Sequence, residues 1–243
     1  MLKEFIEHIQ KTTQPLIQQV GDSTFAIGSD GSAEEIRPTI DRPDTLPLHS
    51  LDALVKLVRT EASRVETPLY ITIPDHLTVR CFGQPQPDAR FFRQMYYEAK
   101  ATDVPGWGEM VQLGFEEAQI AMRTRFQETT DTIYALKLLS DICCGAKVVY
   151  NDNGIATNVT TQKGVALQSN EQIRPIITLK PYRTFQEVEQ PESIFLIRVN
   201  ERGITFTEAD GGMWKLKARQ TVKAFLEEQL AEEVAGNGVY IAL

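Results

Sequence analysis

The stretch that decides the fold is AKVVYNDNGIATNVTT, residues 146–161, in which two strand-forming runs flank Asn153-Gly154. Asn-Gly accepts the positive φ angles of a type I′ turn, whose twist matches the antiparallel strands that it joins. We therefore predict a β-hairpin over residues 146–161. A hairpin here favours a sheet built from strands that are neighbours in the sequence.

Short runs rich in β-branched and aromatic residues predict further strands at 69–73, 77–82, 176–179, 194–199, 204–207 and 239–241. Pro74-Asp75-His76 separates the first two runs, and we interpret it as a turn rather than as a carboxylate-histidine pair for acid/base chemistry. Residues 90–101 mix strand-forming and helix-forming types, and we interpret them as a strand.

Apolar residues at helical spacing predict helices at 50–63, 115–126, 132–143 and 215–234. The Ser50 hydroxyl can accept from an amide of the first turn that follows it, which fixes the start of the first of these helices. Strands cluster along the chain rather than alternate with helices. The sequence therefore predicts an α+β fold, with a mainly antiparallel sheet and several helices packed on it.

The first 45 residues differ from the rest in composition. Leu2, Phe5, Ile6 and Ile9 form an apolar stripe, which predicts an amphipathic helix. The segment Gly28–Pro47 is rich in glycine, serine, aspartate and proline, which is typical of a loop. We predict a helix-and-loop arm at 1–45 and an α+β core domain at 46–243. A short amphipathic helix needs a partner, so the arm is expected to support a homo-oligomer.

Bulk composition excludes several classes of protein. The chain has 243 residues, 42% of them hydrophobic, and a net charge of -8. This is enough apolar material for a packed core, while the acidic balance disfavours non-specific binding to nucleic acid. No apolar run reaches the roughly 20 residues of a membrane-spanning helix. Three cysteines, two of them adjacent, and acidic residues within Met1–His8 favour a cytoplasmic protein.

Residue types that often carry chemistry occur without the spacing that the chemistry needs. His8, His49 and His76 stand in no metal-ligand pattern, and no glycine-rich phosphate-binding motif follows a predicted strand. Cys143 and Cys144 end a predicted helix, where free cysteines usually pack in a core. We therefore expect no metal and no cofactor, and a non-enzymatic protein is favoured over an enzyme.

Two tryptophans and two glutamates are candidate binding residues. Trp107 and Trp214 lie in glycine-containing loops where an indole can stack on a base, although packing against a helix is the favoured interpretation. Glu187 and Glu189 would share one face of an extended strand. Two such carboxylates can hold a cation, but we favour the interpretation that the glutamates lie on a solvent-exposed face and pair with Arg183.

Three segments carry a resemblance to a known family: Leu48–Leu54, Tyr150–Gly154 and above all LKPYRTFQEVEQP at 179–191. In these, the chain from about residue 46 onward resembles an uncharacterised family of bacteriophage and prophage proteins, distantly similar to the YfdQ-like group. The Tyr-Arg-Thr-Phe part is the specific one. The resemblance implies a phage or prophage origin and a non-structural gene, so the expected location of the protein is the cytoplasm of the host cell. It supplies no catalytic residues.

The leading hypothesis is a non-enzymatic phage accessory protein that self-associates and binds a host protein or a small ligand. The first alternative is an accessory nucleic-acid-binding factor in recombination or replication, and the second is a metal-dependent hydrolase that uses Glu187, Glu189 or Asp210. The candidate binding residues are Tyr182, Arg183, Phe185, Glu187, Glu189, Trp107 and Trp214. Within residues 181–191 we favour a structural brace in which Arg183 is buried against one of the neighbouring carboxylates.

Overall fold

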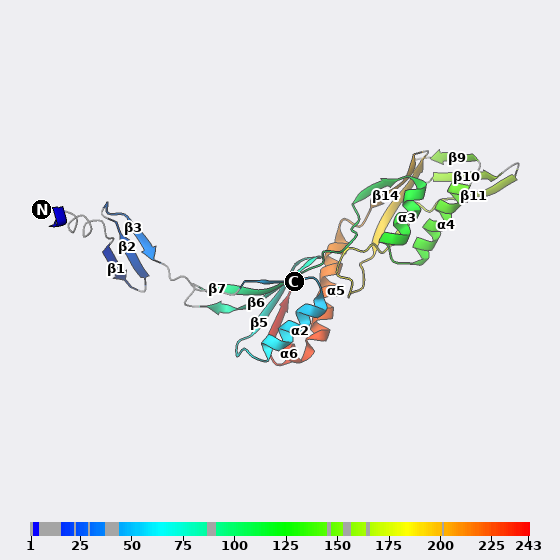
Figure 1. The fold of residues 1–243 in the computed structure, drawn as a ribbon. Coiled ribbons are helices and arrows are strands. Elements are labelled where there is room, and N and C mark those ends of the chain that lie inside the picture. Colours follow the sequence, from blue (N-terminus) through cyan, green and yellow to red (C-terminus); the bar gives the residue numbers. More distant parts are fainter. Residues whose placement is uncertain are drawn as a thin grey trace. The chain divides into compact units, whose positions relative to one another are not determined.

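A computed structural model shows an α+β protein, so the predicted fold class is confirmed (Figure 1). The structure describes residues 2–4, 16–21, 23–28, 30–36, 44–86, 91–144, 147–152, 157–163, 166–200 and 202–243. The chain divides into two compact units, Met1–Pro43 and Asp44–Leu243.

The first unit contains a three-stranded antiparallel sheet of β1 (Leu16–Val20), β2 (Ser23–Ile27) and β3 (Ala33–Ile36), in that order. Gly21 and Gly31 adopt positive φ angles of 61° and 83° in the two turns. The expected loop from Gly28 to Pro47 is therefore wrong in part, because a tight turn after Gly28 returns the chain as β3. Of the predicted N-terminal helix, residues 2–4 are helical and residues 5–15 lie outside the described part.

The second unit holds two cores, and the first is built on a five-stranded sheet in the order β15-β5-β6-β7-β4. Its strands are β4 (Leu46–Leu48), β5 (Leu69–Asp75), β6 (Thr78–Gln86), β7 (Phe92–Lys100) and β15 (Val239–Ala242). Pairing is antiparallel except between β15 and β5 and between β4 and β7. The helices α2 (Leu51–Ala62), α5 (Met213–Gln229) and α6 (Ala231–Ala235) lie on one side of this sheet in Figure 1. Buried leucines such as Leu51, Leu54 and Leu226 each contribute about 1.5–3 kcal/mol to this core.

The second core lies, in the sequence, between β7 and α5. Its four-stranded antiparallel sheet has the order β12-β13-β14-β8, with β8 (Met110–Leu113), β12 (Ile176–Leu179), β13 (Ser193–Asn200) and β14 (Gly203–Glu208). The helices α3 (Phe115–Arg125) and α4 (Thr130–Cys144) pack their apolar sides with one face of the sheet. A third sheet, ordered β11-β10-β9, follows α4 and consists of β9 (Lys147–Asp152), β10 (Thr157–Lys163) and β11 (Ala166–Gln172).

Most predicted elements are confirmed, including the strand at 90–101, which is β7. The hairpin at 146–161 is confirmed as the antiparallel pair β9 and β10, while its Asn153-Gly154 turn lies outside the described residues. The strands β1, β2, β3, β4, β8 and β11 were not predicted. The single helix expected at 215–234 is wrong in one respect, because the chain leaves helical geometry at the fully buried Leu230 and divides it into α5 and α6.

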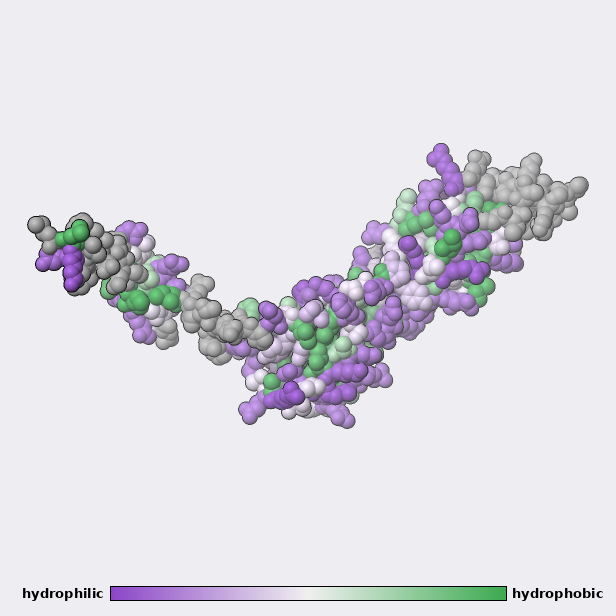
Figure 2. Space-filling view, viewed as in Figure 1, coloured by the Kyte–Doolittle hydropathy of each residue, from purple (hydrophilic) through white to green (hydrophobic). Residues whose placement is uncertain are grey.

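Several large apolar side chains of the second unit remain exposed, and Figure 2 shows hydrophobic patches among its hydrophilic surface. They include Met110, Ile120, Ile133, Ile176, Ile194, Met213 and Leu216. No helix in the described part of the chain is long and apolar enough to cross a membrane.

Candidate functional site

Residues 180–192, here called the bridging segment, connect β12 to β13 in the second core and also reach the first core. Phe185 and Val188 are buried there among the side chains of α2, α5 and the five-stranded sheet. Thr184 donates a hydrogen bond of 2.6 Å from its Oγ1 to the carbonyl of His76, in the turn after β5. The bridging segment is therefore the structural brace that the sequence favours.

One glutamine holds the bridging segment in its folded path. The Gln190 side chain is buried, and its Oε1 accepts from the backbone amides of Arg183 and Thr184 at 2.8 and 3.1 Å. Its Nε2 donates to the carbonyl of Phe185 at 2.9 Å. Nε2 also donates to the Val188 carbonyl at 3.3 Å, so one buried side-chain amide hydrogen-bonds to four backbone groups that have no strand or helix partner here.

Arg183 is the charged centre of the junction, and its side chain is only 2% exposed. Its guanidinium forms an ion pair with Glu208 and donates from Nη1 to Ser193 Oγ at 3.0 Å. Its Cζ also lies 4.3 Å from the ring centroid of Trp214. Burial lowers the pKa of Arg183 below its ordinary value, while Glu208 acts in the opposite direction. Its Nε and Nη2 are buried and have no hydrogen-bond partner in the described part of the chain.

Trp214 and His76 complete what we call the Arg183 cluster, which consists of Arg183, Ser193, Glu208, Trp214 and His76. The Trp214 indole Nε1 donates to Glu208 Oε2 at 3.1 Å, and the His76 ring meets the indole edge to face at a centroid distance of 4.7 Å. Burial is the main cause that lowers the pKa of His76, with Lys215 and Arg183 acting in the same direction and Asp75 opposing them. Asp75 itself accepts from the Leu77 amide, as a turn residue does.

The two candidate glutamates serve different purposes, and neither is the partner of Arg183. Glu187 Oε1 accepts from the Leu51 amide at 2.8 Å, so this carboxylate caps the N-terminus of α2. Glu189 is 72% exposed and pairs with Lys180 at 2.8 Å. The expectation that Arg183 is buried against a neighbouring carboxylate is therefore wrong in its partner, since Glu208 of β14 takes that place. Tyr182 is half-buried, and its amide donates to the carbonyl of Arg125.

A pocket of about 550 Å³, here called the Trp214 pocket, opens where the start of α5 meets β12 and β13. Three apolar side chains at its rim are substantially exposed: Met213 at 63%, Ile194 at 43% and Leu216 at 41%. The other lining residues are Trp214 and the polar residues Thr178, Glu192, Ser193, Asp210, Lys217 and Gln220. Ser193 and Trp214 are shared with the Arg183 cluster, so buried polar contacts fix part of the pocket lining.

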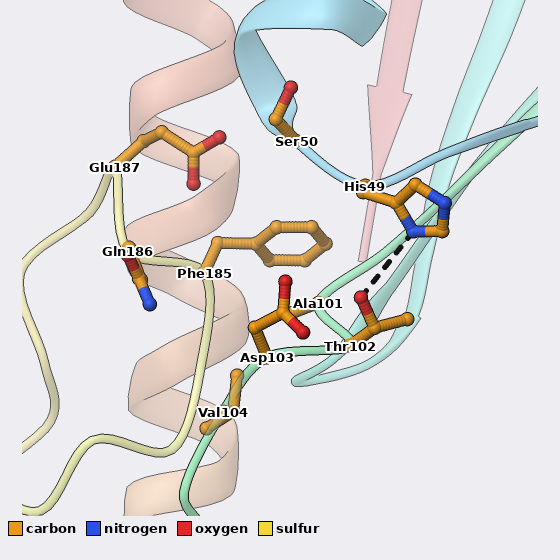
Figure 3. Close-up of a pocket in the computed structure, with 9 residues that line it drawn as sticks. All are labelled: His49, Ser50, Ala101, Thr102, Asp103, Val104, Phe185, Gln186 and Glu187. Carbon is orange, nitrogen blue, oxygen red and sulfur yellow. Dashed lines mark hydrogen bonds between the residues drawn. The ribbon is translucent and has the colours of Figure 1, made fainter.

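A second pocket, of about 300 Å³, lies beside the start of α2 (Figure 3). His49 Nδ1 and Thr102 Oγ1 face each other there at 3.4 Å, and Asp103 and Phe185 also line the space. The distance is at the long end of the hydrogen-bond range, so the contact between the hydroxyl and the imidazole is weak. The pocket can accept a small polar molecule.

Trp107 lines a separate groove of about 240 Å³ between β8 and α3. Its ring packs edge to face on Phe126 at a centroid distance of 4.7 Å, and its indole Nε1 is buried without a hydrogen-bond partner in the described residues. A buried donor left unpaired costs about 1–3 kcal/mol. We call this the Trp107 groove, lined by Trp107, Val111, Leu113, Glu117, Ile120, Ala121, Thr124 and Arg125.

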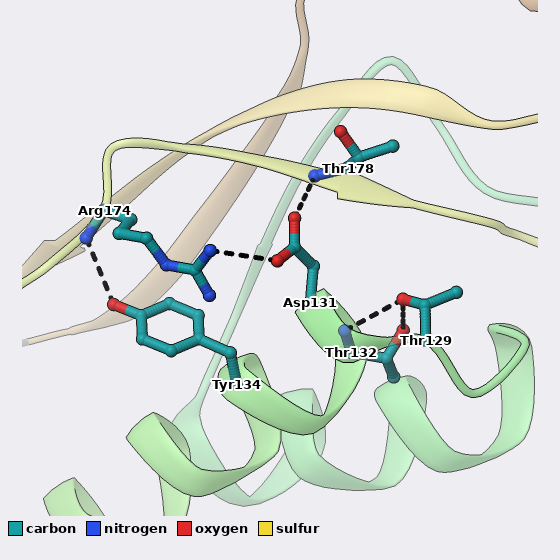
Figure 4. Close-up of polar contacts among 6 residues, drawn as sticks. All are labelled: Thr129, Asp131, Thr132, Tyr134, Arg174 and Thr178. Atoms are coloured by element: carbon teal, nitrogen blue, oxygen red, sulfur yellow. Dashed lines mark hydrogen bonds and ion pairs between the residues drawn. The ribbon is translucent and has the colours of Figure 1, made fainter.

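Polar contacts from α4 secure the outer strand β12, which carries Thr178 of the Trp214 pocket (Figure 4). Asp131 Oδ2 accepts from the Thr178 amide at 2.8 Å, and its Oδ1 bonds Arg174 Nη1 at 3.0 Å. The Arg174 guanidinium also lies 3.8 Å from the ring centroid of Tyr134. Asp131 therefore accepts from a backbone amide of β12, which is one edge strand of this sheet. The edge strand at the opposite end is β8.

Five of the seven candidate residues fall into three separate places, and Tyr182 and Glu189 line none of the three pockets. Arg183 and Trp214 lie together, Phe185 and Glu187 face the second pocket, and Trp107 lies in its own groove. Among the described residues, no group of three or more histidine, cysteine, aspartate or glutamate side chains is placed to hold a metal ion. Sequence reasoning missed Ser193 and Glu208, whose role depends on a pairing between distant segments that no local pattern displays.

No family model, curated protein or solved structure matches the chain.

Proposed function

We propose that this chain is a non-enzymatic accessory protein that binds a host protein or a small ligand in the Trp214 pocket. One observation carries the proposal: exposed Met213, Leu216 and Ile194 line a pocket whose lining also includes Ser193 and Trp214 of the Arg183 cluster. Binding sites commonly combine apolar walls with a few fixed polar groups, and a volume of about 550 Å³ suits such a site. The phage or prophage setting that the resemblance implies belongs to the same proposal.

The charges around the Trp214 pocket determine which charged groups on a partner would fit it. Asp210, Glu192 and Lys217 lie among the apolar side chains, so two carboxylates and one ammonium surround the opening. Lys180 already pairs with Glu192 at 3.3 Å, which leaves Asp210 and Lys217 as the charges without an ion pair within the described residues. A partner that presents an apolar group beside a cation and an anion would match this arrangement.

Substitution at the rim tests the proposal directly. Leu216→Asp places a charge at the apolar rim of the pocket, and Ile133→Asp is the matched control, because Ile133 is an exposed apolar residue of α4 that lines none of the three pockets. Host proteins that co-purify with each variant are identified by mass spectrometry, and bound small ligands are detected by native mass spectrometry. We expect capture by the wild type and by Ile133→Asp and loss in Leu216→Asp. Equal capture by both variants contradicts the proposal.

Self-association is the second part of the proposal, and β1 supports it. This strand reads Leu16-Ile17-Gln18-Gln19-Val20, is exposed along its whole length and lies at one edge of its sheet. Figure 2 shows hydrophobic residues on the surface of this unit. An uncharged edge strand without proline is a template for pairing with another strand, and two copies of β1 can pair about a two-fold axis.

Charges on this edge test the pairing. Ile17→Lys combined with Gln19→Lys should lower the mass per particle in light scattering, because lysines repel each other across paired edges. Deletion of residues 1–43 should lower that mass by more than the deleted segment accounts for. The control is Ile133→Lys in α4. An oligomer that persists in both altered chains contradicts self-association through this unit.

A further inference from the structure

The strand β8 presents an open edge within the described part of the chain, because it ends the order β12-β13-β14-β8. The Glu208 amide donates to the Glu109 carbonyl at 2.7 Å, which fixes the alternation of peptide groups along β8. In an antiparallel ladder, Val111 and Leu113 then bond β14, and the N–H and C=O groups of Met110 and Gln112 point away from it. These groups can accept one more strand.

The Trp107 groove lies directly beside this edge. Val111 and Leu113 of β8 form one wall and Ile120 and Ala121 of α3 the other, with Trp107 at one end. Ile120 is 57% exposed, so apolar surface of the groove is open to solvent. A strand added to β8 lies about 4.8 Å from it and directs alternate side chains toward the α3 side, where the groove can take them.

The two ends of the groove carry opposite charges. The helix α3 begins directly after β8, so Glu117 in its first turn lies toward the Leu113 end. Arg125 in its last turn lies toward the Trp107 end, where Phe126 packs on the indole. Charge complementarity therefore calls for a basic residue on a partner strand near Glu117 and an acidic residue near Arg125.

We propose that the open edge of β8 and the Trp107 groove bind an extended segment of a partner protein by strand addition. Because the whole sheet is antiparallel, the segment runs antiparallel to β8, with a basic residue at its start, β-branched aliphatic residues in the middle and an acidic residue at its end. Main-chain hydrogen bonds to Met110 and Gln112 hold it, and the groove selects its side chains. This site is separate from the Trp214 pocket and does not depend on it.

A blocked heptapeptide, acetyl-Lys-Thr-Val-Thr-Val-Thr-Glu-amide, is the probe, because its lysine, valines and glutamate share one face of a strand. Its charge-reversed form, acetyl-Glu-Thr-Val-Thr-Val-Thr-Lys-amide, has the same composition and is the control peptide. Binding to the full chain is measured by isothermal titration calorimetry, and the indole N–H resonance of Trp107 is followed by NMR. We expect the first peptide to bind more tightly than the second, with a shift of that resonance.

Gln112→Pro removes one outward N–H from the edge without removing a bond to β14, and Gln112→Ala keeps it. The proline variant should bind the first peptide at least about tenfold more weakly, and the alanine variant should bind it as the wild type does. Ile120→Glu, which charges the groove without touching the backbone, should weaken binding as well, whereas Leu216→Asp should leave it unchanged. Absence of binding to the wild type, or equal binding by the proline and alanine variants, overturns the proposal.

Discussion

Arg183 and Glu208 form a buried ion pair between the bridging segment and the end of β14, with side chains that are 2% and 6% exposed. The pair is enclosed by Trp214, which stacks on the guanidinium and donates to the carboxylate. The charge that remains when one member is removed is therefore largely shielded from water. The junction between the two cores of the second unit therefore depends on both members.

Arg183→Met should destabilise the chain by about 3–5 kcal/mol, because it leaves Glu208 buried without its cation. Urea denaturation measures the loss. Lys223→Met is the control, since Lys223 pairs with Glu227 on the surface of α5 at 3.5 Å and such pairs contribute about 0–1 kcal/mol. The addition of Glu208→Gln to Arg183→Met should recover part of the stability. Equal stability of Arg183→Met and Lys223→Met would show that the pair contributes nothing.

Glu187→Ala should destabilise the chain by about 0.5–2 kcal/mol, because the Leu51 amide at the start of α2 loses its acceptor. Glu189→Ala is the matched control two residues away, and it removes only an exposed ion pair with Lys180. Thermal denaturation of the two variants compares them directly. A larger effect for Glu189→Ala would refute the assignment of Glu187 as the cap.

Gly203→Ala should destabilise the chain strongly, because a Cβ at this position would lie 2.0 Å from the Leu113 carbonyl oxygen of β8. Gly106→Ala is the control: Gly106 also has a positive φ, but a Cβ there meets nothing within 4 Å. Gly106→Ala therefore measures only the cost of placing alanine at a positive φ angle, about 1–2 kcal/mol. If both variants melt at the same temperature, β8 does not lie against β14 as described.

Stability should fall as the pH drops below the ordinary His76 pKa of 6.5. The folded state lowers this pKa, so the unfolded chain binds the proton first and acid favours unfolding, while the contribution is fully present above 6.5. The free energy of unfolding is measured at about pH 7.5 and about pH 5.5 in the wild type and in His76→Gln. The variant should lose less stability between the two. Identical losses would exclude His76 as a source of the pH dependence.

Much of the fold could be predicted from the sequence because its signals are local. The alternation within residues 69–82 and the cap at Ser50 both act over a few residues, and both are seen as β5, β6 and α2. The strand β8 was missed because it is only four residues long and follows a glycine-containing loop. Its place as a strand comes from its pairing with β14, far along the chain.

The candidate site shows the same limit. That Arg183 would be buried could be inferred from its aromatic and acidic neighbours in the sequence. Its partner could not, because Glu208 and Trp214 reach Arg183 only when β14 and α5 fold beside the bridging segment. The pocket rim, with Ile194 on β13 and Met213 on α5, likewise combines segments that no local pattern connects.

Photo-crosslinking from the pocket rim tests the central claim, that the Trp214 pocket is the recognition site. The full chain carries p-benzoyl-phenylalanine in place of Leu216 or, as control, in place of Ile133, and is irradiated inside the cells that produce it. Gel electrophoresis detects a crosslinked protein, and intact-mass spectrometry detects an added small ligand. The account predicts a product from position 216 that is absent from position 133 and is lost on Ile194→Asp. No product at 216, or equal products at both positions, would contradict it.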